Sequence, residues 1–253
     1  MSQRAMIVAL DDAETLRVLA PGRVRRFYLL MLPALLAVLF CGFGGWLAST
    51  EDELMILGIA LIAVGVAMGL AYLIFESFFI GVLPARCYLR WLRERIDRRP
   101  DAVVTSDNPD ALFVQHIPRR NWKVSMGENA GDVGLLLIDY GRGVMLYEGD
   151  DERWVIPGES IRSFKLESFT PPNGVDALNR HTVVMLKVDV DDEEDPLVTP
   201  LAGHPIHWRP WTPRSREDAA KRLRKAIGHL VDPERWPRPT AEDLYPLLPP
   251  PKV

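Results

Sequence analysis

Two uncharged apolar runs, separated by only five residues, constrain this chain more than any other feature of its sequence. Residues 27–48 and residues 54–75 are each 22 residues long and contain no charged side chain. At about 1.5 Å per residue, a helix of that length crosses the roughly 30 Å hydrocarbon layer of a bilayer. Backbone polar groups in lipid must be satisfied within the segment, so both runs are predicted to be helices. The short connection predicts a transmembrane hairpin within residues 27–83.

The flanking charges predict how the hairpin is oriented. Arginines lie outside both apolar runs, whereas the connection holds three acidic residues and no basic one. The flanking arginines are Arg23, Arg25, Arg26, Arg86, Arg90, Arg93, Arg95, Arg98 and Arg99. The positive-inside rule then predicts a multi-pass protein of the cytoplasmic (inner) membrane, with both termini in the cytoplasm. A cleaved signal peptide is disfavoured, because residues 1–26 are long and contain acidic side chains.

Small residues recur at helical spacing in both predicted spans and favour close helix packing. They are Ala37, Cys41 and Gly44 in the first span, and Gly58, Gly65 and Gly69 in the second. Packing within the hairpin is the favoured interpretation, and homo-oligomerisation through this face is the alternative. An acidic residue in a span is a candidate functional residue by default. Glu76 lies near the cytoplasmic end of the second span, where an ion pair with the first arginines is favoured over a transport role.

A basic helix is predicted at residues 84–99, directly after the hairpin. Its apolar residues recur at spacings of three and four, and arginines occupy the other faces. This pattern is typical of a helix in the headgroup layer, anchored by aromatic rings and attracted to anionic lipid. The predicted membrane-interface residues are Tyr88, Arg90, Trp91, Arg93 and Arg95.

Residues 100–235 predict a soluble domain of short strands followed by one helix. The strand-like segments are 112–117, 122–126, 133–139, 143–148, 153–156, 160–169 and 181–190. An apolar stripe at Ala219, Leu223, Ala226, Ile227 and Leu230 predicts a helix over 216–231, capped by Ser215. Residues 1–26 form an N-terminal cytoplasmic segment, and the proline-rich tail, 236–253, is expected to be extended. Residues 100–253 carry 19 Lys and Arg against 25 Asp and Glu, which argues against nucleic-acid binding.

The stretch 135–168 reads LLLIDYGRGVMLYEGDDERWVIPGESIRSFKLES and resembles bacterial membrane proteins with a pleckstrin-homology-like (PH-like) domain. The resemblance rests on the order of strands and turns, followed by a C-terminal amphipathic helix. It implies an α+β chain in which a two-helix transmembrane hairpin precedes an antiparallel β-barrel or sandwich with a C-terminal α-helix. It also implies a membrane-tethered binding or scaffolding module. Arg119, Arg120 and Lys123 form only a small basic cluster, so phosphoinositide binding is not carried over.

No catalytic or cofactor-binding pattern is found in the sequence. Nucleotide-binding loops, zinc-protease motifs and the nucleophile elbow are absent. His204 and His207 lack a clear third metal ligand, and the acidic run 189–195 lacks the glycine and glutamate of a calcium loop. Trp208 and Trp211 could line an aromatic groove, although covering the β core is the favoured interpretation. No metal or cofactor is therefore expected.

Three functions stay open at this stage. The favoured one is a non-enzymatic, membrane-tethered interaction or scaffolding module for a protein or lipid partner. The second is a subunit of a larger membrane complex, or a homo-oligomer, assembled through the small-residue faces. The third is an interfacial enzyme acting on lipid headgroups, which a deep polar pocket with a His or acid of shifted pKa would favour.

Overall fold

The chain folds into two compact units, Pro21–Gly81 and a second unit formed by Met1–Ala20 together with Val82–Val253. The structure is a computed structural model that describes residues 4–10, 18, 32–50, 54–79, 82–116, 132–170, 180–191, 195–203, 212–244 and 247–248, with the side chains of 74–84 excepted. We call Pro21–Gly81 the hairpin unit, and Met1–Ala20 together with Val82–Val253 the β unit. Each is described by itself.

The hairpin unit consists of two long apolar helices, α2 (Leu32–Thr50) and α3 (Met55–Phe79), packed against each other. Large apolar side chains cover their outer faces, and Val38 and Ile56 are 68% and 78% exposed. The 25 residues of α3 extend about 37 Å, more than the hydrocarbon layer requires. Both helices are therefore consistent with membrane spans.

The α2–α3 contact is built on glycine. A Cβ atom on Gly58 would lie 2.6 Å from the backbone oxygen of Gly44, and one on Gly65 would lie 2.8 Å from that of Ala37 and 2.6 Å from Cys41 Sγ. Gly69 makes an ordinary contact, 3.8 Å from Ala37 Cβ. The predicted packing residues therefore meet within the hairpin. The side chain of Glu76 lies outside the described residues.

The β unit contains one eight-stranded sheet in which each strand is antiparallel to its neighbours, in the order β1-β5-β4-β3-β2-β8-β7-β6. The sheet curls into a half-barrel, and the expected α+β class is confirmed. The strands are β1 (Met6–Ala9), β2 (Leu112–His116), β3 (Asp132–Asp139), β4 (Val144–Gly149), β5 (Glu152–Pro157), β6 (Ile161–Phe169), β7 (His181–Val188) and β8 (Leu197–Gly203).

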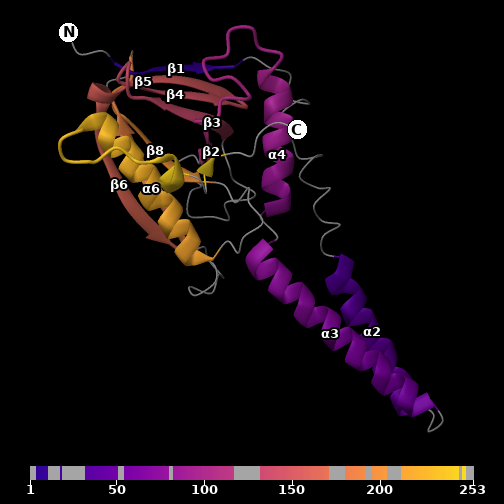
Figure 1. The fold of residues 1–253 in the computed structure, drawn as a ribbon. Helices are drawn as coiled ribbons and strands as arrows, with labels where there is room; N and C mark the ends of the chain where they lie inside the picture. Colours follow the sequence, from indigo (N-terminus) through magenta and orange to yellow (C-terminus); the bar gives the residue numbers. More distant parts are fainter. Residues whose placement is uncertain are drawn as a thin grey trace. The chain divides into compact units, whose positions relative to one another are not determined.

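One helix closes the open side of the half-barrel. Helix α6 (Pro213–Val231) packs on β6, β7 and β8 (Figure 1). Its predicted stripe faces the core, where Leu223 and Ile227 are fully buried beside Trp154 and Tyr147. The helix begins earlier than predicted, because Thr212 rather than Ser215 is the N-cap and accepts a hydrogen bond from the Ser215 backbone N–H.

Two strands were missed by the sequence analysis. β1 has only four residues and finds its partner β5 about 145 residues later, beyond the reach of a local pattern. β8 contains Pro200, which favours a loop in a sequence pattern. The structure accommodates Pro200 because the pairing of β8 with β2 begins only at Leu201.

The described part of the C-terminal segment, 236–244 and 247–248, packs on the β unit, whereas an extended tail was expected. Trp236 packs so closely on Gly228 that a Cβ there would lie 2.5 Å from its ring, and Leu247 is fully buried against Gly203. A short helix, α7 (Ala241–Leu244), lies between them. With β1 and the basic helix α4 (Val82–Ile96) included, the β unit is larger than the expected 100–235.

We expect Gly65→Ala to destabilise the hairpin by about 1–3 kcal/mol, because its new methyl group meets backbone that cannot move without separating the helices. Gly45→Ala is the matched control, since nothing lies within 4 Å of a Cβ at Gly45. The measurement is the unfolding midpoint of the full chain in mixed micelles with increasing SDS, followed by circular dichroism. Equal midpoints for the two variants would show that the helices do not meet at Gly65.

Candidate functional site

Two buried carboxylates lie at the end of β4 and in the turn that follows it. The side chain of Glu148 is fully buried, and that of Asp150 is 2% exposed. A buried carboxylate is costly unless charged and polar partners replace its water. The partners at this turn come from parts of the chain far from it in sequence.

Glu148 is held by two arginines. Arg99 Nη1 lies 3.0 Å from Oε1, while Arg153 donates from Nε to Oε2 at 2.7 Å and from Nη2 to Oε1 at 3.0 Å. The Val103 backbone N–H adds a hydrogen bond of 3.0 Å to Oε2. Arg153 also pairs with the exposed Asp101 at 2.7 Å. Because Arg153 forms a bidentate pair with Glu148, it fixes the orientation of the Glu148 carboxylate.

Asp150 joins the two ends of the chain that lead into the hairpin. Its Oδ1 pairs with the buried guanidinium of Arg95 on α4, and its Oδ2 accepts a hydrogen bond from the Val18 backbone N–H. Val18 precedes the hairpin in the sequence, and Arg95 follows it. We call Asp150, Arg95 and Val18 the arm junction. Burial raises the pKa of Asp150 to about 6, although Arg95 and the Val18 N–H act in the opposite direction.

Further hydrogen bonds hold the backbone of this turn in place. Arg99 donates to the backbone oxygens of Gly149 and Asp150 at 2.6 and 2.9 Å. The buried Asp132 at the start of β3 accepts hydrogen bonds from four backbone N–H groups, those of Val133, Asp150, Asp151 and Glu152. Complete burial and the neighbouring acids hold the pKa of Asp132 well above its usual range. Only glycine fits at position 149, where a Cβ would lie 1.9 Å from Asp132 Oδ2.

A histidine near this turn is part of the packed interior. His116 on β2 meets Trp154 edge-on at 5.1 Å, and its Nδ1 lies 3.9 Å from Glu152 Oε2. Burial lowers the pKa of His116 to about 4, so the ring is neutral at neutral pH. Glu152 Oε2 in turn accepts a hydrogen bond from Trp154 Nε1 at 2.9 Å. His116 therefore packs as a neutral core side chain.

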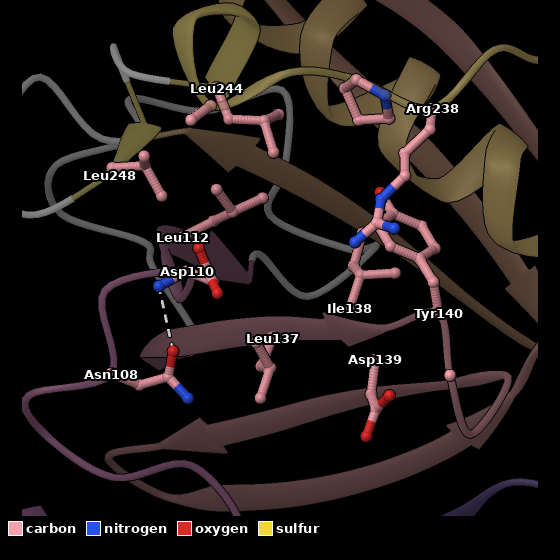
Figure 2. Close-up of a pocket in the computed structure, with 13 residues that line it drawn as sticks. Asn108, Asp110, Leu112, Leu137, Ile138, Asp139, Tyr140, Arg238, Leu244 and Leu248 are labelled. Atoms are coloured by element: carbon pink, nitrogen blue, oxygen red, sulfur yellow. Dashed lines mark hydrogen bonds between the residues drawn. The ribbon is translucent and has the colours of Figure 1, made fainter.

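A groove of about 530 Å³ lies elsewhere in the β unit, where β2 and β3 meet the C-terminal segment (Figure 2). Arg238 and Tyr140 lie at one end, with the guanidinium 5.1 Å from the ring centre, and Asn108 and Asp110 lie at the other. The remaining lining residues are Leu112, Leu137, Ile138, Asp139, Gly141, Pro239, Ala241, Leu244 and Leu248. The volume falls within the range of ligand sites.

The groove and the residues with displaced pKa values mostly lie apart. Among the described residues, no histidine lines the groove, and the buried acids Asp132 and Asp150 do not line it. Tyr140 is the exception: burial raises its pKa to about 12, and its hydroxyl donates to the backbone oxygen of Ala226 at 3.3 Å. The described lining of the groove therefore offers apolar contact, one guanidinium and two carboxylates.

The structure places three of the five predicted membrane-interface residues inside the β unit. Tyr88, Arg93 and Arg95 are at most 9% exposed, whereas Arg90 is exposed and Trp91 is half-buried. An interface role stays a prediction for Arg90 and Trp91. The charge of Arg95 is instead directed to Asp150.

Several other candidates lie outside the described residues: Arg119, Arg120, Lys123, His204, His207, Trp208 and Trp211. Of the acidic run, Asp189 pairs with Arg162, and its backbone bonds to Ala5. Within the described part of the chain, no group of three or more His, Cys, Asp or Glu residues could hold a metal ion. Asp132, Glu148 and Asp150 were not among the predicted site residues, because no local sequence pattern distinguishes a buried acidic residue from a solvated one.

Comparison with protein-family models, with curated proteins and with solved structures gave no match in any of the three. This is an α+β protein in which two long apolar helices, consistent with membrane spans, lie in the sequence between the first and second strands of an eight-stranded half-barrel.

We expect Arg95→Met to destabilise the β unit by about 3–5 kcal/mol at pH 8, because it leaves the Asp150 carboxylate buried without its cation. The loss should be smaller at pH 5. Removing the cation raises the pKa of folded Asp150 further above its value of about 6, so at pH 5 the group is protonated and needs no counter-charge.

The measurement is urea unfolding of the full chain in mild detergent at both pH values, followed by tryptophan fluorescence. Arg90→Met on the same helix is the control, since its side chain is 68% exposed, and it should change stability by no more than about 0.5 kcal/mol. A loss for Arg95→Met that does not depend on pH would contradict the role given to Asp150.

Proposed function

We propose that this protein is a non-enzymatic, membrane-anchored binding module, and that a two-helix hairpin holds its β unit at the bilayer surface through two arms. The observation that carries the proposal is the arm junction. One buried carboxylate, Asp150, contacts the chain both before and after the hairpin. A single flexible tether would need no such arrangement.

Strand pairing adds a second argument for two arms. β1 precedes the hairpin and pairs with β5, which follows it, so both ends of the hairpin lead into the same sheet. Two spans return the chain to the side from which it started, which agrees with this pairing. The flanking arginines favour the cytoplasmic side for the β unit.

The strand order supports a PH-like assignment as part of the proposal. β2 to β5 form one meander, β6 to β8 form another, the two join through β2 and β8, and a C-terminal helix follows. Strand β1 is an addition supplied by the N-terminal segment. A groove with an apolar floor and a polar rim suits binding of a partner.

The two alternatives have less support. Assembly with other spans through Gly58 and Gly65 would need faces that α2 and α3 already use against each other. An enzyme acting on headgroups would need an acid or base of suitable pKa in the groove, where the described titratable group with a displaced pKa is Tyr140.

Tags at the two termini should be digested by protease in sealed inside-out membrane vesicles and protected in right-side-out ones. In a chain whose native Cys41 and Cys87 are replaced by alanine, a cysteine introduced by Asp52→Cys in the connection between the spans should react with an impermeant maleimide only in right-side-out vesicles. Termini found on opposite sides would be incompatible with pairing of β1 and β5 and would overturn the two-arm proposal.

A photoreactive p-azidophenylalanine in place of Tyr140 should trap a partner on illumination of intact cells, because Tyr140 lines the groove and is half-buried. The same amino acid in place of Lys165, exposed on β6, is the control and should trap none. Adducts are detected as a mass shift of the tagged chain. Equal trapping at both positions, or none at Tyr140, would count against a binding module with this groove as its site.

A further inference from the structure

The groove is open along part of one strand. β2 covers β3 from Asp132 to Leu136, with Leu112 paired to Leu136, whereas β4 pairs with β3 as far as Asp139. Residues 137–139 therefore have a paired side facing β4 and, among the described residues, no strand on the side facing the groove. A bare strand edge presents backbone N–H and C=O groups to any extended chain that approaches.

The chain before β2 turns away from this edge. The Ala111 N–H donates to Asn108 O at 3.3 Å, the Asp110 N–H donates to Asn108 Oδ1 at 2.9 Å, and Pro109 has no N–H. These local bonds use the groups that would otherwise continue the ladder. The edge at 137–139 is thus left open by a defined turn.

The opposite wall of the groove is apolar. Leu244 and Leu248 of the C-terminal segment face the groove across from Ile138 (Figure 2). All three side chains are half-buried and pack against the hydrophobic core. An extended segment lying along β3 would place alternate side chains toward this wall. An apolar side chain in the segment would complete the burial of these residues.

The charged side chains at the rim of the groove indicate which group of a bound segment would lie next to its apolar side chain. Arg238 is exposed and lies against the ring of Tyr140, and no carboxylate pairs with it in the part of the chain that the structure describes. Asp139 is engaged by its own turn, where Oδ1 accepts a hydrogen bond from the Arg142 N–H at 3.0 Å. Arg238 is therefore the group at this end of the groove available to an incoming anion, and a carboxylate matches its guanidinium.

We propose that the groove binds an extended segment of a partner protein that pairs with the edge of β3 at residues 137–139, buries an apolar side chain against Leu244 and Leu248, and places a carboxylate at Arg238. This inference rests on the proposed binding function and names the ligand class of the same groove. The carboxylate belongs to an acidic side chain or to a free C-terminus, which supply the same chemistry.

The test uses the full chain in nanodiscs of zwitterionic lipid and a set of capped hexapeptides that vary two central apolar positions and end in glutamate. Binding is measured by fluorescence anisotropy. Arg238→Gln should weaken the best peptide about tenfold, as expected for loss of a hydrogen bond to a charged group at an exposed site. Arg235→Gln, an exposed arginine of the same segment outside the groove, is the matched control and should leave binding unchanged.

Two modified peptides separate the parts of the proposal. With glutamine in place of the terminal glutamate, wild type and Arg238→Gln should bind equally well, within about twofold. N-methylation of the central backbone should weaken binding at least tenfold, because strand pairing needs the N–H. A free-carboxylate version of the glutamine peptide distinguishes a C-terminus from a side chain.

The inference would be overturned if none of the peptides bound. It would also be overturned if N-methylation of the peptide, or Arg238→Gln in the protein, left the affinity unchanged. Binding of dodecyl phosphate without any peptide would assign the groove to an anionic amphiphile and would also overturn it. These failures differ from failure of the proposed function: if Tyr140 still traps a partner in cells, the module stands and only its ligand class is wrong.

Discussion

The buried carboxylate of Asp150 is the contact on which the organisation of the β unit depends. It receives a guanidinium from α4 and a backbone N–H from the segment before the hairpin. Removing water from a carboxylate costs several kcal/mol, and these two partners offset part of that cost. Docking of both chain ends therefore adds to the stability of the β4–β5 turn, which couples folding of the β unit to the closure of a loop that contains the entire hairpin.

This coupling explains why the unit includes residues on both sides of the hairpin. β1 adds only four residues to the edge of the sheet, and so short a strand contributes few ladder hydrogen bonds. Asp132 fixes the turn because its side-chain carboxyl group accepts hydrogen bonds from four backbone N–H groups. The ion pairs of Glu148 with Arg99 and Arg153 also hold the turn in place. The turn is thus preorganised by long-range charged contacts, and the short strand pairs beside an edge that is already fixed.

The sequence predicted the elements that depend on local periodicity and missed those that depend on distant partners. The hairpin followed from two uncharged runs, the strands β2 to β7 from alternation and turns, and α6 from its apolar stripe. Strand β1 could not be predicted, because MIVA has no pattern of its own and acquires its role from pairing with β5. The arginines of α4 were assigned to lipid for the same reason: charge and spacing do not distinguish an interfacial arginine from one such as Arg95, whose carboxylate lies 55 positions later. The groove was also beyond prediction, since it arises where the pairing of β2 with β3 stops at Leu136, three residues before β3 ends, and where the C-terminal segment folds back.

Strand β3 connects the two features on which the proposed function depends and keeps them apart. Asp132, at its beginning, supports the arm junction, and residues 137–139, at its end, line the groove. Seven residue steps along an antiparallel strand correspond to about 24 Å. A ligand in the groove therefore makes no contact that the anchoring turn uses, and the anchoring charges contribute no side chain to the groove. Since β3 is paired with β4 along most of its length, the two ends are held at a fixed separation by the ladder itself. Anchoring and binding can then change independently, so substitutions at the junction act on stability whereas substitutions at the groove rim act on affinity.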